Sequence, residues 1–253
     1  MRKLAWLVDT AAVALLCGFA SPALAAGGAL NCNGTLTGSL SAGVVVPSNG
    51  SCVLTNATVP SDVNVGGNGY FEADNSKILG NVLGDNAETV YIRDGSRVGG
   101  KVETLGGGQL FVYNSTVNNV IRAENLTNKV EICGSTVSSG GIDVQGLQTG
   151  GPGDEILIGD PLTVGCPGNT VSGGVNVGSN FTDVYSVIRG NTLSSGNPLS
   201  LGNLSVTGNT GTSDKFVQSN IGGQTLTLTC STNASPFVGG PSGTFGSILG
   251  QCF

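Results

Sequence analysis

One pattern of apolar and polar positions recurs along the chain about every twenty residues. Short segments such as "NSTV", residues 114–117, each end on an apolar residue. In the central part of the chain these apolar residues are 19 or 20 positions apart. A fixed period of this length is typical of a solenoid. The recurring apolar residues are Leu36, Val59, Ile78, Val98, Val117, Val137, Val171, Leu193 and Ile221.

Two further columns keep the same register. The residue three positions before each of the first eight apolar members is Asn or Gly, which readily adopt a left-handed backbone, so it predicts a sharp corner. These residues are Asn33, Asn56, Asn75, Gly95, Asn114, Gly134, Gly168 and Gly190. Beyond a second bend, marked by small or polar residues, an apolar residue returns at Leu40, Val63, Val82, Val102, Ile121 and Val175.

Each repeat is therefore predicted to be a set of short strands separated by corners, with no room for a helix. A single repeat cannot bury its apolar side, whereas stacked repeats bury continuous ladders of Val, Ile and Leu. We predict an all-β protein, a single right-handed parallel β-helix of about nine coils of about 20 residues. The β-helix domain is expected over residues 27–230, with an inserted loop at about 147–168 and a C-terminal cap at 231–253.

The first residues, "MRKLAWLVDTAAVALLCGFASPALAAGG", combine a basic start, an apolar run and a small-residue triplet. This order is that of a secretory signal peptide, predicted to span residues 1–26 with cleavage after Ala25 or Ala26. No later apolar run is long enough to cross a membrane. We therefore expect a secreted, extracellular protein without a membrane span in the mature chain.

Charge and composition exclude several functions. The formal net charge is −6 and no basic stripe is present, so nucleic acid is not an expected partner. The chain contains no histidine, which excludes a Ser-His-Asp triad, a Cys-His pair and a histidine-ligated metal. The apolar residues are β-branched and regularly spaced, so the glycine-rich composition indicates packed β structure and not disorder.

Six cysteines follow the predicted signal peptide, and an even number in an exported chain favours disulfides. Six cysteines permit fifteen pairings. We expect Cys32 to pair with Cys52, since twenty residues is one coil, and Cys230 to pair with Cys252 across the cap. By elimination Cys133 would then pair with Cys166 across the inserted loop.

The phrases "LNCNGTLTGSL", "GSCVLTNATV", "KFVQSNIGGQTLTLTC" and "GQCF" resemble secreted bacterial β-helix-like proteins of unknown function. The resemblance covers residues 30–253, most of the mature chain. It implies the same fold and export, and it brings no catalytic residues with it.

A charged cluster is a candidate site for chemistry on polysaccharides. Stacking would bring Asp74 near Asp94 and Lys77 near Arg97, and a lyase could use such carboxylates and cations. Alternating charges on an exposed ladder also simply limit repulsion and keep a rod soluble. The second interpretation is favoured, because nothing in the sequence indicates a concave pocket.

Two further motifs have both a functional and a structural interpretation. "GGPGDEILIG", residues 150–159, resembles a single Ca²⁺-binding turn with Asp154, Glu155 and Asp160 as ligands, although a Gly/Pro loop before a strand explains it equally well. No other cofactor is expected. A column of threonines resembles an ice-binding face, but Lys77 and Arg97 interrupt it. Its members are Thr35, Thr58, Thr116, Thr136, Thr170 and Thr192.

The phrase at Asn114 also fits the N-glycosylation rule, as do seven other triplets, but a chain rich in Asn, Ser and Thr produces them by composition. The resulting hypothesis is an exported structural or adhesive β-solenoid without catalytic activity. Its partner would be an extracellular carbohydrate or matrix. The alternatives are a protein that binds or cleaves extracellular polysaccharide, and an ice- or matrix-binding protein.

Overall fold

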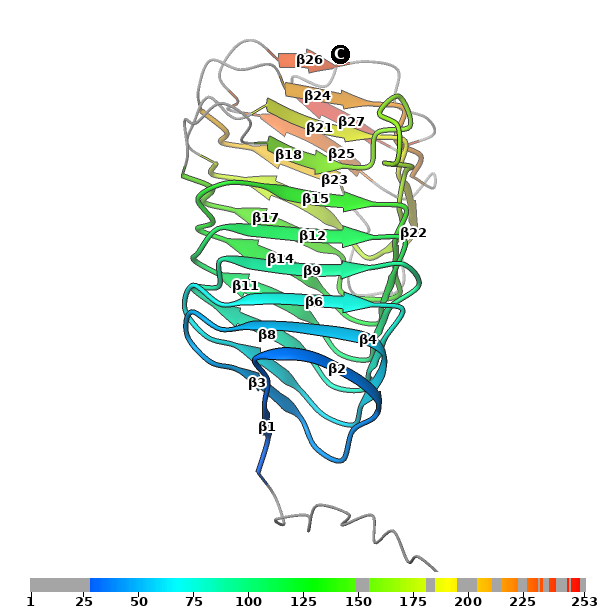
Figure 1. The fold of residues 1–253 in the computed structure, drawn as a ribbon. Coiled ribbons are helices and arrows are strands. Elements are labelled where there is room, and N and C mark those ends of the chain that lie inside the picture. Colours follow the sequence, from blue (N-terminus) through cyan, green and yellow to red (C-terminus); the bar gives the residue numbers. More distant parts are fainter. Residues whose placement is uncertain are drawn as a thin grey trace, which may run out of the picture.

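The computed structural model is an all-β solenoid in which the chain winds through about nine parallel coils (Figure 1). It describes residues 28–148, 155–180, 185–194, 204–210, 215–222, 227–231, 233, 237–239, 245 and 247–250. Every strand pair in these segments is parallel, and partners in the central coils are 19 to 21 residues apart. The predicted fold class is confirmed. The predicted signal peptide lies outside the described residues.

One sheet of eleven strands forms the first face of the solenoid, which we call the first-sheet face. Its strands come from successive coils, with β1 and β27 at the two ends, so strands far apart in sequence lie side by side in coil order. In spatial order its strands are β1 (Leu30–Asn31), β3 (Val44–Val46), β5 (Val63–Val65), β8 (Val82–Asp85), β11 (Val102–Leu105), β14 (Ile121–Glu124), β17 (Ile142–Gln145), β20 (Val175–Gly178), β23 (Leu204–Thr207), β25 (Thr227–Ser231) and β27 (Ser247–Gly250).

The second sheet has sixteen strands and folds around a corner within β4 (Ser51–Val59), so it supplies two faces. The long-strand face continues from β4 through β6 (Tyr70–Asp74), β9 (Thr89–Arg93), β12 (Gln109–Tyr113), β15 (Val130–Cys133), β18 (Glu155–Ile158), β21 (Tyr185–Arg189), β24 (Lys215–Gln218) and β26 (Phe237–Gly239). The short-strand face continues from β4 through β7 (Lys77–Ile78), β10 (Arg97–Val98), β13 (Thr116–Val117), β16 (Thr136–Val137), β19 (Thr170–Ser172) and β22 (Thr192–Ser194). The strand β2 (Gly34–Ser39) pairs with β4.

The predicted apolar column forms one edge of the core. From Val59 to Leu193 its members are in register and buried, and none is more than 3% exposed. The column from Val63 to Val175 on the first-sheet face is buried in the same way. Because each side chain packs on its counterparts above and below, the period of the sequence becomes a continuous core.

The end coils depart from the predicted register. Leu36 pairs with Leu54 and not with Val59, and β2 contains a one-residue register shift between Thr37 and Gly38. Val44, and not Leu40, precedes Val63 on the first-sheet face. Ile221 bridges to Thr192 and is 51% exposed, so it continues the outward column beside the core column to which we assigned it.

The corner before the short-strand face has the predicted left-handed residues. The backbone angle φ is positive at Asn56, Asn75, Gly95, Asn114, Gly134 and Gly190, but not at Asn33 or Gly168. The residue after each corner is buried and polar in most coils. Its side chain accepts a hydrogen bond from the corresponding backbone N–H of the preceding coil, as Ser135 Oγ does from Ser115 N and Asn191 Oδ1 from Asn169 N.

A second asparagine ladder lies at the corner between the first-sheet and long-strand faces. Asn180, Asn209 and Asn233 are at most 6% exposed and each accepts from the coil before it. These ladders supply partners for buried backbone N–H groups that turn away from the sheets. Two of the N-x-S/T triplets begin at Asn180 and Asn233, whose amides are therefore structural.

The limits predicted for the inserted loop, 147–168, are wrong. Residues 155–158 form β18, which pairs with β15 and β21, so the extra residues lie in two segments on either side of this strand. The second segment contains a turn in which Asp160 N donates to Cys166 O at 2.9 Å. The tip of this turn leaves Leu162 and Val164 exposed.

Two of the three expected disulfides are present, Cys32–Cys52 and Cys133–Cys166, with Cα atoms 5.4 and 4.6 Å apart. Cys230 is also disulfide-bonded, and its expected partner Cys252 lies outside the described residues. The expected boundary between solenoid and cap at 230–231 falls inside β25. Since β26 and β27 extend the two sheets, the described part of the cap is a further coil. The described residues contain no helix able to cross a membrane.

Candidate functional site: the aromatic strip of the long-strand face

The four charged residues proposed as a catalytic cluster are not brought together. Lys77 and Arg97 are neighbours in register on the short-strand face, as predicted. Asp74 is in register with Arg93 on the long-strand face, because the corner after β9 contains an additional residue, Asp94. Asp74 and Asp94 both lie beside Arg93, and none of the ion pairs among the described residues joins either acid to Lys77 or Arg97.

Arg93 is the residue that organises this part of the face, and sequence reasoning missed it. Its guanidinium lies 2.6 Å from Glu72, 2.9 Å from Asp94 and 3.5 Å from Asp74. The same guanidinium lies 5.5 Å from the ring centroid of Tyr91. Three carboxylates and an aromatic ring thus share one cation, which holds the Tyr91 ring beside a charged border.

Aromatic rings form a patch on the outer side of β9 and β12, which we call the aromatic strip and define as Tyr91, Phe111 and Tyr113. Their ring centroids lie 5.4, 5.7 and 6.3 Å apart. All three side chains are part-exposed, and strands β9 and β12 lie side by side in the stack (Figure 1). Their neighbours along the strands, Val90, Leu110 and Val112, point into the core.

A cluster of acids borders the strip on β15 and β18. Tyr113 donates its hydroxyl to the Glu131 carboxylate, and Lys129 Nζ lies 3.4 Å from Glu131 and 2.9 Å from Glu155. Burial, together with the hydrogen bond to Glu155 and its charge, raises the pKa of Glu131 to about 8. Burial opposes ionisation of Glu155, but the hydrogen bonds from Glu131 and Lys129 outweigh it and lower the pKa of Glu155. One proton is therefore held between two carboxyl groups.

The other border of the strip lies on β6, where Tyr70 donates its hydroxyl to Glu72. Burial, with the hydrogen bond to Glu72, raises the pKa of Tyr70 to about 12, so the phenol stays neutral. The strip is thus bounded on both sides by tyrosine–carboxylate contacts and by one cation on each side, Arg93 and Lys129. These side chains fix one another and keep the rings in place.

The proposed calcium ligands are placed apart. Glu155 begins β18 and contacts Lys129, whereas Asp160 follows the end of that strand. Asp160 is 4% exposed and lies 2.8 Å from Arg189, with a further hydrogen bond from Thr163. Asp154 lies outside the described residues. Among the side chains that the structure places, no group of three or more His, Cys, Asp or Glu residues is arranged to hold a metal ion.

The threonine column exists on the short-strand face from Thr116 through Thr136 and Thr170 to Thr192. Thr58 continues it below Lys77, while Thr35 pairs with Val53 and does not belong to it. Lys77 and Arg97 interrupt the column on one side and Ile221 ends it on the other. It is a narrow row with only one threonine in each coil.

The signal for the aromatic strip was present in the strand sequences "YFEAD", "VYIRD" and "LFVYN". Alternate residues of a strand face opposite sides, so the outward set can be read once the buried set is known. No family model, curated protein or solved structure matches the chain, so its function has to be inferred from the geometry of these faces.

Proposed function

We propose that this protein is an exported structural or adhesive rod that binds extracellular polysaccharide through the aromatic strip. The observation that carries the proposal is the contiguous patch of part-exposed rings of Tyr91, Phe111 and Tyr113 on a regular sheet. A sugar ring has an apolar C–H face, and planar aromatic side chains offer it a large contact at a low cost in side-chain entropy.

The repeat of the fold suits a polymer. Neighbouring strands of a sheet lie about 4.8 Å apart, which is close to the length of one sugar unit in an extended polysaccharide. A chain lying along the axis of the solenoid would therefore meet β6, β9, β12 and β15 with successive units. Glu72 and Glu131 lie in register with Tyr91 and Phe111 respectively, so each ring has a carboxyl group in an adjoining coil to receive sugar hydroxyls.

Charge favours a neutral polymer. The strip is bordered by Glu72, Asp74, Asp94, Glu131 and Glu155, against the two cations Arg93 and Lys129. Even with one proton on Glu131, carboxylates outnumber cations. A polymer of uronic acids or sulfated sugars would be repelled at low salt.

The arrangement of the acids supports binding without cleavage. A glycosidase of the usual type holds its two carboxyl groups about 5 Å or more apart, so that sugar or water fits between them. Lys129 bridges Glu131 and Glu155 at 3.4 and 2.9 Å, which ties both carboxyl groups to one cation. The lyase-like set is divided by the corner between Asp74 and Lys77.

The fold and its disulfides are compatible with an extracellular protein and with a structural or binding role. Export through the predicted signal peptide is part of the proposal. In an oxidising compartment the bridges would persist and hold the end coil and the 159–168 segment.

The test is sedimentation with insoluble polysaccharides, neutral (cellulose, chitin, xylan) and acidic (pectate gel), using the full mature chain. The variant Y91L/F111L keeps apolar bulk but removes the flat rings, and we expect at least tenfold weaker binding. Leu79 and Leu105 are exposed leucines on other parts of the solenoid, so L79A/L105A is the matched control and should bind as wild type.

Binding of Y91L/F111L equal to that of wild type on every polymer would refute the strip as the binding surface. Release of reducing ends or unsaturated products by wild-type protein would refute the claim that it binds without cleavage. Preference for pectate gel over the neutral polymers would contradict the charge argument.

A further inference from the structure

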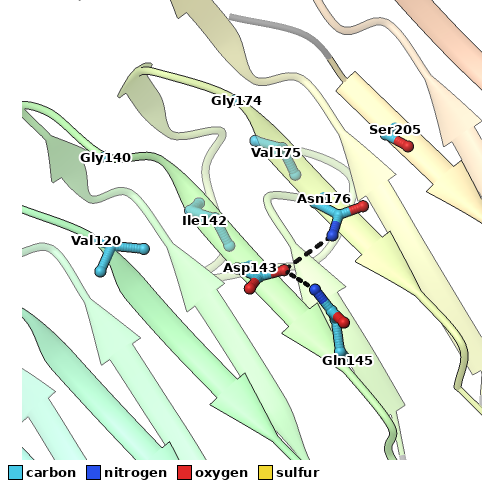
Figure 2. A pocket seen from close by; sticks show the side chains of 9 residues that line it. All are labelled: Val120, Gly140, Ile142, Asp143, Gln145, Gly174, Val175, Asn176 and Ser205. Carbon is cyan, nitrogen blue, oxygen red and sulfur yellow. Dashed lines mark hydrogen bonds between the residues drawn. The ribbon is translucent and has the colours of Figure 1, made fainter. Parts of the chain in front are cut away.

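The first-sheet face carries a depression of about 390 Å³ that the aromatic strip does not reach. Figure 2 shows that its lining comes from β17, β20 and β23, together with the corners that precede β14, β17 and β20. Val120 is part-exposed and contributes its apolar part, whereas Ile142 and Val175 lie beneath it in the core and are 1% and 0% exposed. Asp143, Asn176, Gln145 and Ser205 contribute its polar part. Such a mixture of an apolar floor and a few polar groups is typical of small-ligand sites.

Glycines keep the depression open. Gly141 and Gly174 occupy the position that Val120 occupies in an earlier coil, since Ile121, Ile142 and Val175 are in register. Gly140, beside Gly141, has a φ of +78°, and a Cβ there would lie 2.7 Å from Asn119 Oδ1 and 2.9 Å from Val120 N. A side chain at Gly140 would therefore displace the preceding coil, and these glycines add no side chain to the lining.

The polar groups form a fixed array around Asp143. Its Oδ1 accepts from Asn176 Nδ2 at 2.9 Å and from Gln145 Nε2 at 2.7 Å, as the dashed lines in Figure 2 show. Both amide groups thus direct nitrogen at the carboxylate and turn their oxygens away from it. The hydroxyl of Ser205 lies beyond Asn176 in the same outward column.

We propose that this depression is a second saccharide site, which holds one neutral sugar unit by hydroxyl groups on adjacent carbon atoms. The amide oxygens of Asn176 and Gln145 accept hydroxyl protons, and Asp143 Oδ2, which is 3.7 Å from Arg122 Nε, accepts another. The C–H face of the sugar ring lies against Val120. Planar amide and carboxylate groups match pairs of hydroxyls because they offer acceptors and donors side by side.

The same array disfavours other ligand classes. A calcium ion needs several oxygens pointing at one centre, whereas Asn176 and Gln145 point nitrogen at Asp143. An anionic sugar would meet Asp143 and the nearby Glu103 and Glu124, and Arg122 is already held by Glu124 at 2.7 Å. A neutral sugar would not be repelled by these carboxylates.

The depression and the aromatic strip lie on different faces, so their occupants do not compete. If the proposed function of the strip holds as well, one rod would bind two glycan chains and link them. The saccharide site itself does not depend on that, because its contacts come only from β17, β20, β23 and the corners beside them.

The test is amide chemical-shift perturbation by NMR on the full mature chain, titrated with glucose, galactose, mannose and N-acetylglucosamine, then glucuronate and calcium chloride. We expect at least one neutral sugar to shift the amides of 140–145 and 174–178 at millimolar concentration. N176A should weaken this binding at least tenfold. N64A removes an asparagine from the same outward column several coils away and should bind as wild type.

A neutral-sugar response that persists in Y91L/F111L and is lost in N176A would establish the site independently of the strip. The proposal is wrong if none of the neutral sugars shifts these amides, if N176A binds as tightly as wild type, or if only calcium or glucuronate produces the response. A failure here leaves polymer sedimentation by the strip unchanged, so the two proposals can fail separately.

Discussion

Lys129 lies 2.9 Å from Glu155 across strands β15 and β18, and the same ammonium group lies 3.4 Å from Glu131. One cation therefore faces two carboxyl groups that are hydrogen-bonded to each other. Two ionised carboxylates side by side would repel each other, and Lys129 compensates only one negative charge. Glu131 therefore keeps its proton and Glu155 loses it. This pairing makes the stability of the strip depend on pH near neutrality.

The sign of that dependence follows from Glu131. Its folded pKa of about 8 is above the ordinary value of 4.5, so its contribution to stability is complete below about pH 4.5 and is lost as pH rises through 8. The lowered pKa of Glu155 acts in the opposite direction, at acid pH. Between pH 6 and 9 we expect the wild type to lose about 1–2 kcal/mol of unfolding free energy through Glu131.

The variant E131Q keeps an uncharged group that accepts from Tyr113 and donates to Glu155. Urea unfolding at pH 6, 7.5 and 9 should therefore show a flatter profile for E131Q than for wild type. Glu103 pairs with Lys101 at 2.6 Å on the first-sheet face, so E103Q is the control and should keep the wild-type slope. An E131Q profile parallel to that of wild type would show that Glu131 is ionised throughout this range.

Arg93 is predicted to hold three carboxylates against their mutual repulsion. Replacing it with glutamine leaves Glu72, Asp74 and Asp94 without a shared cation, and we expect a loss of about 1–2 kcal/mol at low salt. Added sodium chloride should restore part of that loss, because it screens the repulsion. The measurement is thermal unfolding of R93Q across salt concentrations.

Arg97 provides the matched control for that experiment. It lies on the neighbouring short-strand face, and none of the ion pairs among the described residues involves it. R97Q should therefore show the salt dependence of wild type. A salt response of R93Q that is no larger than that of R97Q would contradict the role assigned to Arg93.

Asn191 is predicted to be a costly polar residue to remove from the solenoid. Its Oδ1 accepts from both nitrogens of Asn169, and its Nδ2 donates to Ile158 O at 2.7 Å and to Asn220 at 2.9 Å. N191A leaves these buried groups unpaired and should cost about 2–4 kcal/mol in denaturant unfolding. N118A, at an exposed asparagine, should change the free energy of unfolding by less than about 0.5 kcal/mol. Equal losses in the two variants would contradict a stabilising role for the buried asparagine ladder.

Much of the fold could be predicted because one period governs several columns at once. Ile78, Val98 and Val117 are 20 and 19 residues apart and fall in register, as their spacing indicates. The same period failed at Leu36, where β2 shifts register, and at Ile221, where the segments before it vary in length. At the ends a coil has a neighbour on only one side, so less packing fixes its register.

The sites were harder to predict than the fold. Asp94 was expected to stack on Asp74, but the residue in register with Asp74 is Arg93. Spacing alone could not show that the corner after β9 contains one additional residue. Glu155 was treated as part of a loop, since a four-residue strand between two insertions has no periodicity of its own. The aromatic strip needs the outward register of β9 and β12 together, and the depression needs Gly141 and Gly174 to follow Val120 in successive coils. Both depend on which coils are neighbours.

The Cys32–Cys52 bridge is predicted to stabilise the first coil alone. In this coil β2 pairs only with β4 on this face and β1 pairs only with β3, so the coil has a neighbour on one side only. A coil at the end of a solenoid can open without disturbing its distant neighbours. The variant C32A/C52A should therefore lose hydrogen-exchange protection at residues 30–46 and keep it in β9 and β12.

The Cys133–Cys166 bridge offers an internal comparison, because it joins a central coil to the 160–166 turn. C133A/C166A should instead raise hydrogen exchange in that turn. Each double variant should lose at most about 2–4 kcal/mol of unfolding free energy, and less where only the freed segment opens. If C32A/C52A lowered protection uniformly from β2 to β15, the coils would unfold as one unit. The terminal bridge would then stabilise the whole rod, and the nearest-neighbour description of this solenoid would be wrong.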